Sequence, residues 1–180
     1  MAELSKYTPN LRLGIRLKTI ILLRSIAVIG QLVTCLVVSN FLNFKLPYIE
    51  VYLTIGALAL SNFILFLLYS WNKRLSETTT TFVIGADIIQ LALLIFFTGG
   101  LSNPFVMLFI VPIAISIDNL PIRSSLILIV LTIVSVSIIG LYNYPLIKSD
   151  FSYLINPPII TIGIWFSLLV TILFLSLIHI

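Results

Sequence analysis

Charged residues are scarce in this chain: Asp, Glu, Lys and Arg make up 9% of its 180 residues, whereas soluble domains carry roughly 25%. An ordinary water-soluble globular fold is therefore excluded. Cysteine is nearly absent too, and the single Cys35 cannot form an intrachain disulfide. A free cysteine in an apolar stretch usually serves as a small packing residue, and we interpret Cys35 in that way. We predict neither a metal site nor catalytic residues in this chain.

Apolar residues are abundant and make up 60% of the chain. They gather in six stretches, and a membrane span requires about 20 such residues. Their approximate bounds are Thr19–Phe41, Tyr48–Trp71, Thr81–Thr98, Pro104–Ile117, Ser124–Tyr142 and Pro158–Ile180. The fourth stretch is the shortest and holds Pro112, so we expect it to be kinked or to extend to Leu120. The sequence thus predicts an all-α membrane protein with six transmembrane helices.

Basic residues are distributed unevenly along these stretches. Eight lie near the starts of the first, third and fifth stretches: Lys6, Arg12, Arg16, Lys18, Arg24, Lys73, Arg74 and Arg123. Two, Lys45 and Lys148, lie after the ends of the first and fifth stretches, on the other side of the membrane. Because cytoplasmic loops carry the excess of Lys and Arg, we predict that both termini are cytoplasmic. Residues 1–18 then form a cytoplasmic juxtamembrane segment on the lipid surface, and residues 19–180 form the membrane domain. Charges placed beside spans indicate topology rather than nucleic-acid binding.

A short uncharged run, Gly99-Gly100-Leu101-Ser102-Asn103-Pro104-Phe105, separates the third and fourth stretches. Adjacent glycines permit positive φ, and an Asn before a Pro is typical of a helix start. We expect a tight hairpin whose next helix begins with free N–H groups and a positive dipole end. A flat neutral molecule with carbonyl oxygens, such as a quinone, could bind those donors and lie against the ring of Phe105. The same residues are also common turn formers, so a plain turn remains open.

Ionisable side chains inside a membrane are costly and are therefore candidates for function. Asp87 lies about six residues into the third stretch and Arg24 at a similar depth in the first, so an ion pair between them would make both tolerable. A proton-handling role for the pair is the alternative. Gln31 and Gln90 follow at helical spacing on the same two stretches. They are either hydrogen-bonded links between helices or an extension of the hairpin site into the bilayer.

The hairpin run also matches a known family. Gly-Gly-x-x-Asn-Pro-Phe in this setting resembles the quinone-sensing motif of the RegB/PrrB/ActS redox-responsive sensor histidine kinases. Further similar segments are Arg16–Thr19 and Gly30-Gln31, Asn72–Ser76, Asp87–Ala92, Val111–Ser116 and Leu120–Arg123. The resemblance covers most of the sensor half of that family and none of its kinase half.

This resemblance implies a redox-sensing input domain of a two-component phosphorelay, located in the bacterial inner membrane. It implies ubiquinone as the sensed ligand, bound by Gly99, Gly100, Asn103, Pro104 and Phe105. It further implies a homodimer, a cytoplasmic kinase part that uses ATP, and a cognate response regulator that receives the phosphoryl group. The regulatory cysteine of the family lies in that cytoplasmic part, so Cys35 does not inherit its role.

Two other classes of function remain as alternatives, a small multi-span transporter and a membrane anchor subunit of another enzyme. The stretches show no inverted repeat of the kind found in transporters. The last stretch stops at Ile180 without a basic flank. We therefore expect the chain to be the membrane part of a longer protein whose ATP-dependent kinase part is absent here.

Overall fold

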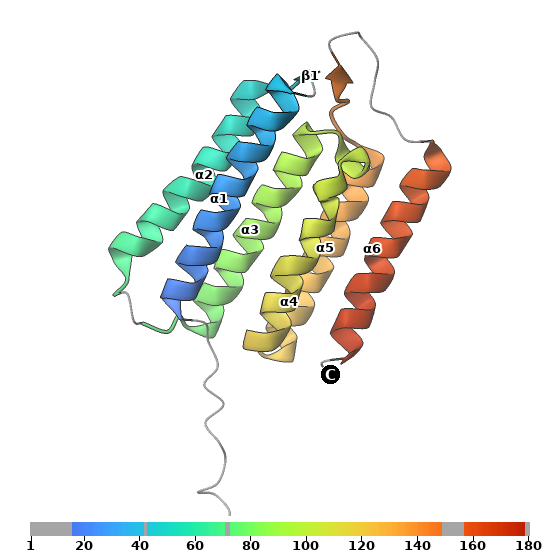
Figure 1. Cartoon of the computed structure of the whole chain (residues 1–180). Helices are drawn as coiled ribbons and strands as arrows, with labels where there is room; N and C mark the ends of the chain where they lie inside the picture. The colour runs from blue at the N-terminus through green and yellow to red at the C-terminus, as the bar shows by residue number, and fades with distance from the viewer. Residues whose placement is uncertain (1–15, 42, 71–72, 149–156, 179–180) are drawn as a thin grey trace, which may run out of the picture.

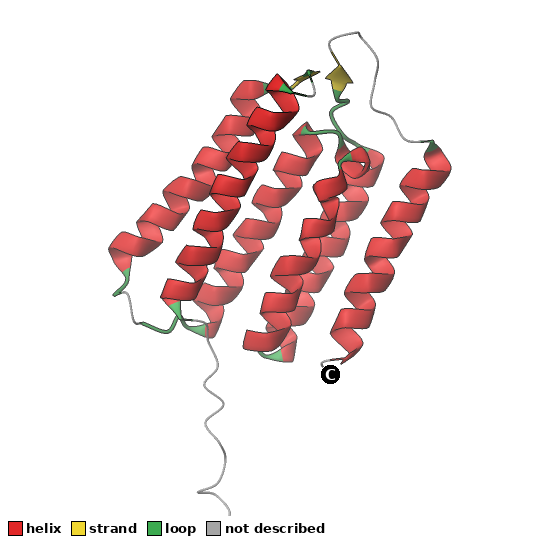
Figure 2. Ribbon diagram, in the orientation of Figure 1, coloured by secondary structure: helices red, strands yellow, loops and turns green. Residues whose placement is uncertain are grey.

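The computed structural model describes residues 16–41, 43–70, 73–148 and 157–178. They form six helical passes (Figures 1 and 2). The helices are α1 (Leu17–Asn40), α2 (Tyr48–Leu68), α3 (Glu77–Phe97), α4 (Ile110–Asn119), α5 (Ile122–Leu141) and α6 (Pro158–Ile178). Two 3₁₀ segments, η2 (Gly100–Ser102) and η3 (Pro104–Phe109), lie between α3 and α4. Most of the predicted segment 1–18 lies outside the described residues.

Five of these helices are long and apolar enough to cross a membrane, and the fourth pass, Pro104–Asn119, is shorter. The prediction of an all-α membrane protein with a short fourth pass is therefore confirmed. This pass begins as η3 and becomes α-helical at Ile110. Pro112 lies in the first turn of α4, where its absent N–H removes no helical hydrogen bond.

Helix α3 begins four residues earlier than the predicted Thr81. The hydroxyl of Ser76 accepts a hydrogen bond from the Thr79 backbone N–H at 3.2 Å and caps the helix. The threonines after it are therefore helical, although they lack the apolar character by which the stretch was delimited. This shift places Asp87 ten residues into a 21-residue helix, about 15 Å from its start at 1.5 Å per residue. The carboxyl group is thus deeper than the sequence predicted.

Helix packing divides the molecule at α3. Helices α3, α4, α5 and α6 pack around one another, while α1 packs on α2 and α2 packs on α3. The larger apolar core lies among α3–α6 and also takes in the start of α1 through Leu17, Ile20 and Ile21. A smaller core near the hairpin end contains Cys35 of α1 and Leu94 of α3. Large apolar side chains cover the outer surface of the bundle, as a lipid environment requires.

The two ends of the bundle differ. Helix α1 begins and α6 ends at the same end, the lower one in Figure 1. At the other end, β1 (Phe44–Lys45) pairs antiparallel with β2 (Ile147–Lys148). This two-residue ribbon joins the α1–α2 connection to the chain between α5 and α6, and it lies at the same end as the α3–α4 hairpin (Figure 2).

Candidate functional site

The predicted hairpin forms a tight turn built on two left-handed glycines. Gly99 has φ 102° and Gly100 has φ 60°, a region that is favourable only for glycine. The backbone N–H groups of Ser102 and Asn103 then donate to the carbonyls of Gly99 and Gly100. These bonds form η2 and turn the chain from α3 into η3.

Asn103 holds both sides of this turn. Its Oδ1 accepts from the Phe105 N–H at 2.9 Å, which makes it the N-cap of η3. Its Nδ2 donates to Thr98 at the end of α3, to Oγ1 at 2.7 Å and to the carbonyl oxygen at 3.2 Å. One amide side chain therefore ties the last residue before the turn to the first helical residues after it.

The N–H groups that we expected to be free for a ligand are already bonded. Pro104 has none, the Phe105 N–H is taken by Asn103 Oδ1, and the Val106 N–H donates to the Asn103 carbonyl at 3.1 Å. The expectation of free donors at the helix start is wrong, because the capping residue that the sequence contains uses them itself.

The space beside the two glycines is filled by the chain that follows α5. A Cβ placed on Gly100 would lie 2.5 Å from Cβ of Asn143, and one on Gly99 would lie 3.4 Å from Leu146. The Tyr144 N–H also donates to the Phe96 carbonyl at the end of α3. The glycines are thus required by the close approach of this segment, rather than by the approach of a ligand to the backbone.

Among the predicted site residues, Pro104 and Phe105 are the exposed ones. The side chain of Phe105 is 40% exposed, while its neighbour Val106 is 2% exposed and belongs to the core. Met107 and Leu108 continue the apolar surface from Phe105 along η3. The hairpin therefore offers a ligand an exposed aromatic ring on a rigid turn.

A second group of polar residues lies within the spans between α1, α2 and α3. Arg24 Nη2 is 2.9 Å from Asp87 Oδ1 and donates to Ser61 Oγ at 2.6 Å. Arg24 is buried, and the side chain of Asp87 is 26% exposed. The structure thus brings together the two charged residues that the sequence singled out. We name Arg24, Asp87, Ser61 and the adjoining Asn62 the midplane cluster.

The two predicted glutamines also meet. Gln90 Nε2 donates to Gln31 Oε1 at 3.2 Å, and Gln31 Nε2 approaches Gln90 Oε1 at 3.5 Å. This pair lies on the hairpin side of the midplane cluster along α1 and α3. No hydrogen bond joins these glutamines to the hairpin in the described part of the chain, so an extension of the hairpin site along this face stays a prediction.

Sequence reasoning missed several contacts of these sites. Asn62 Nδ2 donates to Ser25 Oγ at 3.0 Å and to the Ile21 carbonyl at 3.2 Å. Ser25 follows Ile21 by four residues, so its hydroxyl could have been expected beside the Ile21 carbonyl, to which it donates at 2.8 Å. Asn143 carried no local signal, because its role depends on a contact between segments far apart in the sequence.

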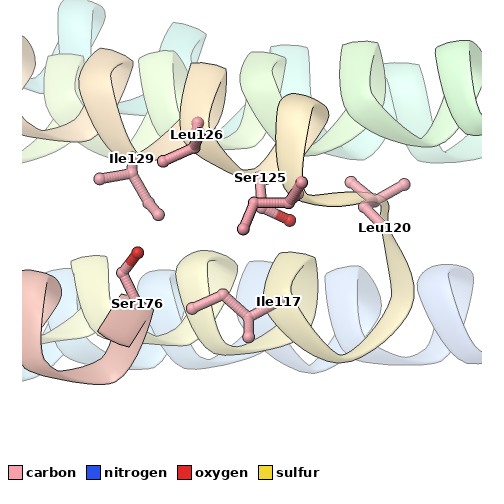
Figure 3. A pocket seen from close by; sticks show the side chains of 7 residues that line it. Ile117, Leu120, Ser125, Leu126, Ile129 and Ser176 are labelled. Carbon is pink, nitrogen blue, oxygen red and sulfur yellow. The ribbon is translucent and has the colours of Figure 1, made fainter. Parts of the chain in front are cut away.

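A small pocket lies at the opposite end of the bundle, between α4, α5 and α6 (Figure 3). Ile117, Leu120 and Ile129 give it an apolar lining. Its buried Ser125 already donates to the Ser116 carbonyl at 3.0 Å. This pocket is remote from the hairpin and uses none of the predicted residues.

Comparisons with known proteins agree with the helical architecture. Residues 10–117 match the family described as PilS-like transmembrane domain. The sensor histidine kinase RegB of Cereibacter sphaeroides is 36% identical over 162 residues, which cover 90% of this chain and 35% of that protein. A second RegB sequence from the same species is 36% identical over 78 residues, which cover 43% of this chain and 17% of that protein. No solved structure matches.

The chain thus spans about a third of the length of the curated relatives that it matches. The matched family and the apolar helices identify a multi-pass protein of the inner membrane. Because the family match covers well over half of the chain, the chain belongs to the PilS-like transmembrane domain family, with a transmembrane sensor region of the RegB type.

Proposed function

We propose that this chain is the membrane-embedded input domain of a two-component sensor histidine kinase, and that its hairpin binds ubiquinone to control autophosphorylation by a cytoplasmic kinase part. The similarity to RegB along 90% of the chain supports the first half of this proposal. The exposed ring of Phe105 on the rigid Gly99–Phe105 turn is the observation that carries the second half.

The proposal includes an orientation and two partners. The start of α1 and the end of α6 share one end of the bundle with Lys73, Arg74 and Arg123, whereas Lys45 lies at the hairpin end. This distribution supports a cytoplasmic location for both termini and a periplasmic hairpin. By analogy with the relatives, the input domain acts as part of a homodimer that passes phosphoryl groups to a response regulator.

The fit of a quinone ring to this site depends on two contacts. The ring would lie against Phe105, since offset aromatic pairs contribute about 0.5–1.5 kcal/mol beyond area burial. A ring carbonyl could replace Thr98 as an acceptor for Asn103 Nδ2, because the two compete for the same donor. A quinol hydroxyl is a donor in its own right and gains less from that amide. Asn103 would thus favour the oxidised form.

This exchange would also connect the ligand to the helices. Asn103 ties Thr98 of the α3 end to η3, so its loss of Thr98 would free the end of α3 to move relative to α4. A ligand can shift that equilibrium only by its difference in affinity for the two arrangements.

The test measures quinone binding to the purified chain in lipid nanodiscs. A short-tail ubiquinone is titrated in, and binding is detected as quenching of tryptophan fluorescence. Trp165 suits this purpose because it lies close to the hairpin. Trp165 and Leu101 of the hairpin both border Gly140, at 3.7 Å and 3.1 Å from the position that a Cβ on Gly140 would take. We expect Phe105→Ala to weaken binding by about three- to tenfold, the loss of one aromatic contact, with unchanged thermal stability.

The matched control is Phe82→Ala, which removes an aromatic ring that is 77% exposed on α3. A second variant, Asn103→Asp, keeps the cap on Phe105 but removes the amide donor, and it should reduce the preference for quinone over quinol. Equal affinities for Phe105→Ala, Phe82→Ala and the wild type would leave the hairpin as a plain turn. Gly100→Val is unsuitable here, because Asn143 occupies the space that its side chain needs.

A further inference from the structure

The midplane cluster lies where an ionised pair is least expected. Asp87 is about 15 Å from the start of α3, which is the middle of a hydrocarbon layer about 30 Å thick. Charged residues at that depth are rare and usually belong to ion or proton pathways. Neither the hairpin nor the proposed quinone site uses this cluster.

The hydrogen bonds of the cluster are incomplete. Among the described residues, Arg24 Nε and Asn62 Oδ1 are buried without a hydrogen-bond partner. Asp87 Oδ1 has its 2.9 Å ion-pair contact with Arg24 but no aligned hydrogen bond. A buried carboxylate held for stability alone is normally bonded by a two-pronged Arg contact or by several donors. The Asp87 carboxylate is held far less firmly than that.

A further unpartnered polar group lies between the cluster and the start of α3. Thr80 is fully buried, and its Oγ1 has no hydrogen-bond partner within the described ranges. It precedes Asp87 by seven residues and therefore shares its helix face. Thr80 gives a proton an intermediate polar position on the way from the basic end of the bundle to Asp87.

Few other titratable groups face Asp87. Helix α1 contributes Arg24, and the part of α2 that meets the cluster contributes Ser61 and Asn62, which do not titrate. The remaining titratable groups of the helices around α3 lie toward helix ends: Lys18, Cys35, Tyr48, Glu50, Tyr52, Glu77, Asp118 and Arg123. The charge state of Asp87 is therefore set mainly by Arg24 and by the membrane.

We propose that the midplane cluster is a proton-binding site, in which Asp87 takes up a proton and thereby releases α1 from α3. The proton comes from a hydronium ion of the aqueous phase: one O–H bond of hydronium breaks, one O–H bond forms on a carboxylate oxygen of Asp87, and water is left behind. Protonation leaves Arg24 as an unpaired charge, which is strongly unfavourable in the bilayer. The Arg24 side chain begins about 10 Å from the start of α1 at Leu17, within reach of the interface by snorkelling.

The helix that would move has few polar links to α3. Helix α1 packs along α2, and its central links to α3 are the Arg24–Asp87 contact and the Gln31–Gln90 pair. Loss of the ion pair therefore removes the stronger of the two links. Proton binding would give the domain an input that is independent of the quinone.

Direct proton uptake is measured by infrared difference spectroscopy of the whole chain in nanodiscs, taken from about pH 8 to about pH 5, the range of physiological switches. We expect a carbonyl stretch of a protonated carboxylic acid to grow on acidification. Asp87→Asn should abolish this band, and Asp118→Asn, at a helix end, should retain it. A band that persists in Asp87→Asn, or a wild type without any such band, would overturn the proposal.

Release of α1 is measured by modification of Cys35, the single cysteine of the chain, which is buried near Leu94 of α3. Asp87→Asn mimics the protonated state and should label several-fold faster than wild type with a membrane-permeant maleimide at neutral pH. The double variant Arg24→Gln/Asp87→Asn lacks the unpaired charge and should label slowly. Rates are expressed relative to the double variant at each pH, which removes the intrinsic pH dependence of the thiol.

Acidification should therefore accelerate wild-type labelling toward the Asp87→Asn rate. If Asp87→Asn does not fold, the wild-type pH profile against the double variant still decides the matter. Equal relative rates at neutral and acidic pH would show that α1 does not respond to the proton. Neither measurement includes a quinone, so failure here leaves the hairpin proposal intact.

Discussion

The two sides of α3 meet their neighbours through different chemistry. Toward α5, Gly85 lets Leu128 approach to 3.5 Å of the position that a Cβ would occupy, and fully buried Ile88 belongs to the same core. Toward α1 and α2, the contacts include an ion pair and two facing amides. Close apolar packing is specific to one arrangement, because interiors are dense and resist small displacements. Polar side chains between membrane helices can exchange one hydrogen-bond partner for another, so these contacts are less specific to one arrangement.

This difference indicates which part of the domain is fixed and which part can change. As long as Asn103 is bonded to Thr98, helices α3–α6 form the fixed part, to which the hairpin belongs through η2 and through its contact with Asn143. The pair α1–α2 forms the adjustable part, and its position depends on the charge state of a few side chains.

The largest effect should come from breaking the ion pair on the adjustable side. Asp87→Asn or Arg24→Gln alone leaves one buried charge without its partner, and each should destabilise the folded chain by about 3–5 kcal/mol. The double variant should recover much of this loss. The measurement is the yield of monodisperse protein and its thermal midpoint in detergent. Additive losses in the double variant would mean that the two residues do not interact energetically.

A smaller effect is expected at the joint between the hairpin and the fixed part. Gly100→Ala introduces a Cβ 2.5 Å from Asn143 at φ 60°, and such strain costs about 1–3 kcal/mol. Gly56→Ala is the control, since a Cβ there meets nothing within 4 Å. The same thermal assay applies. If both substitutions lower the midpoint equally, the close approach of Asn143 is not what fixes the hairpin.

Much of this arrangement follows from local patterns in the sequence. The six passes and the short fourth one were predictable, because span length and apolar character are local properties. The start of α3 was misplaced by four residues, since the Ser76 cap extends the helix through threonines that precede the apolar stretch. The bonded state of the hairpin donors was not predicted, because Asn103 serves its own turn on both sides. The role of Asn143 depends on tertiary structure that no local pattern encodes.

The smallest effect compares neutral side-chain hydrogen bonding on the two sides. Gln90→Leu removes the amide link to Gln31, and Trp165→Phe removes the 3.1 Å bond from its indole N–H to Ser137 Oγ. Each should lower the free energy of unfolding by about 0.6 kcal/mol, the average for hydrogen bonds between membrane helices. Reversible unfolding in mixed micelles measures both. A loss above about 2 kcal/mol for Gln90→Leu alone would exceed the range for such a link and would make the amide pair a principal support of α1.

The ribbon between β1 and β2 has a consequence for biogenesis. Phe44 pairs with Lys148, and at about 5–20 residues per second its partner is synthesised roughly 5–20 s later. During that interval the connection between α1 and α2 has no strand to pair with. Chain order therefore makes closure of this end of the bundle a late step of insertion, one that waits for α5 to cross the bilayer.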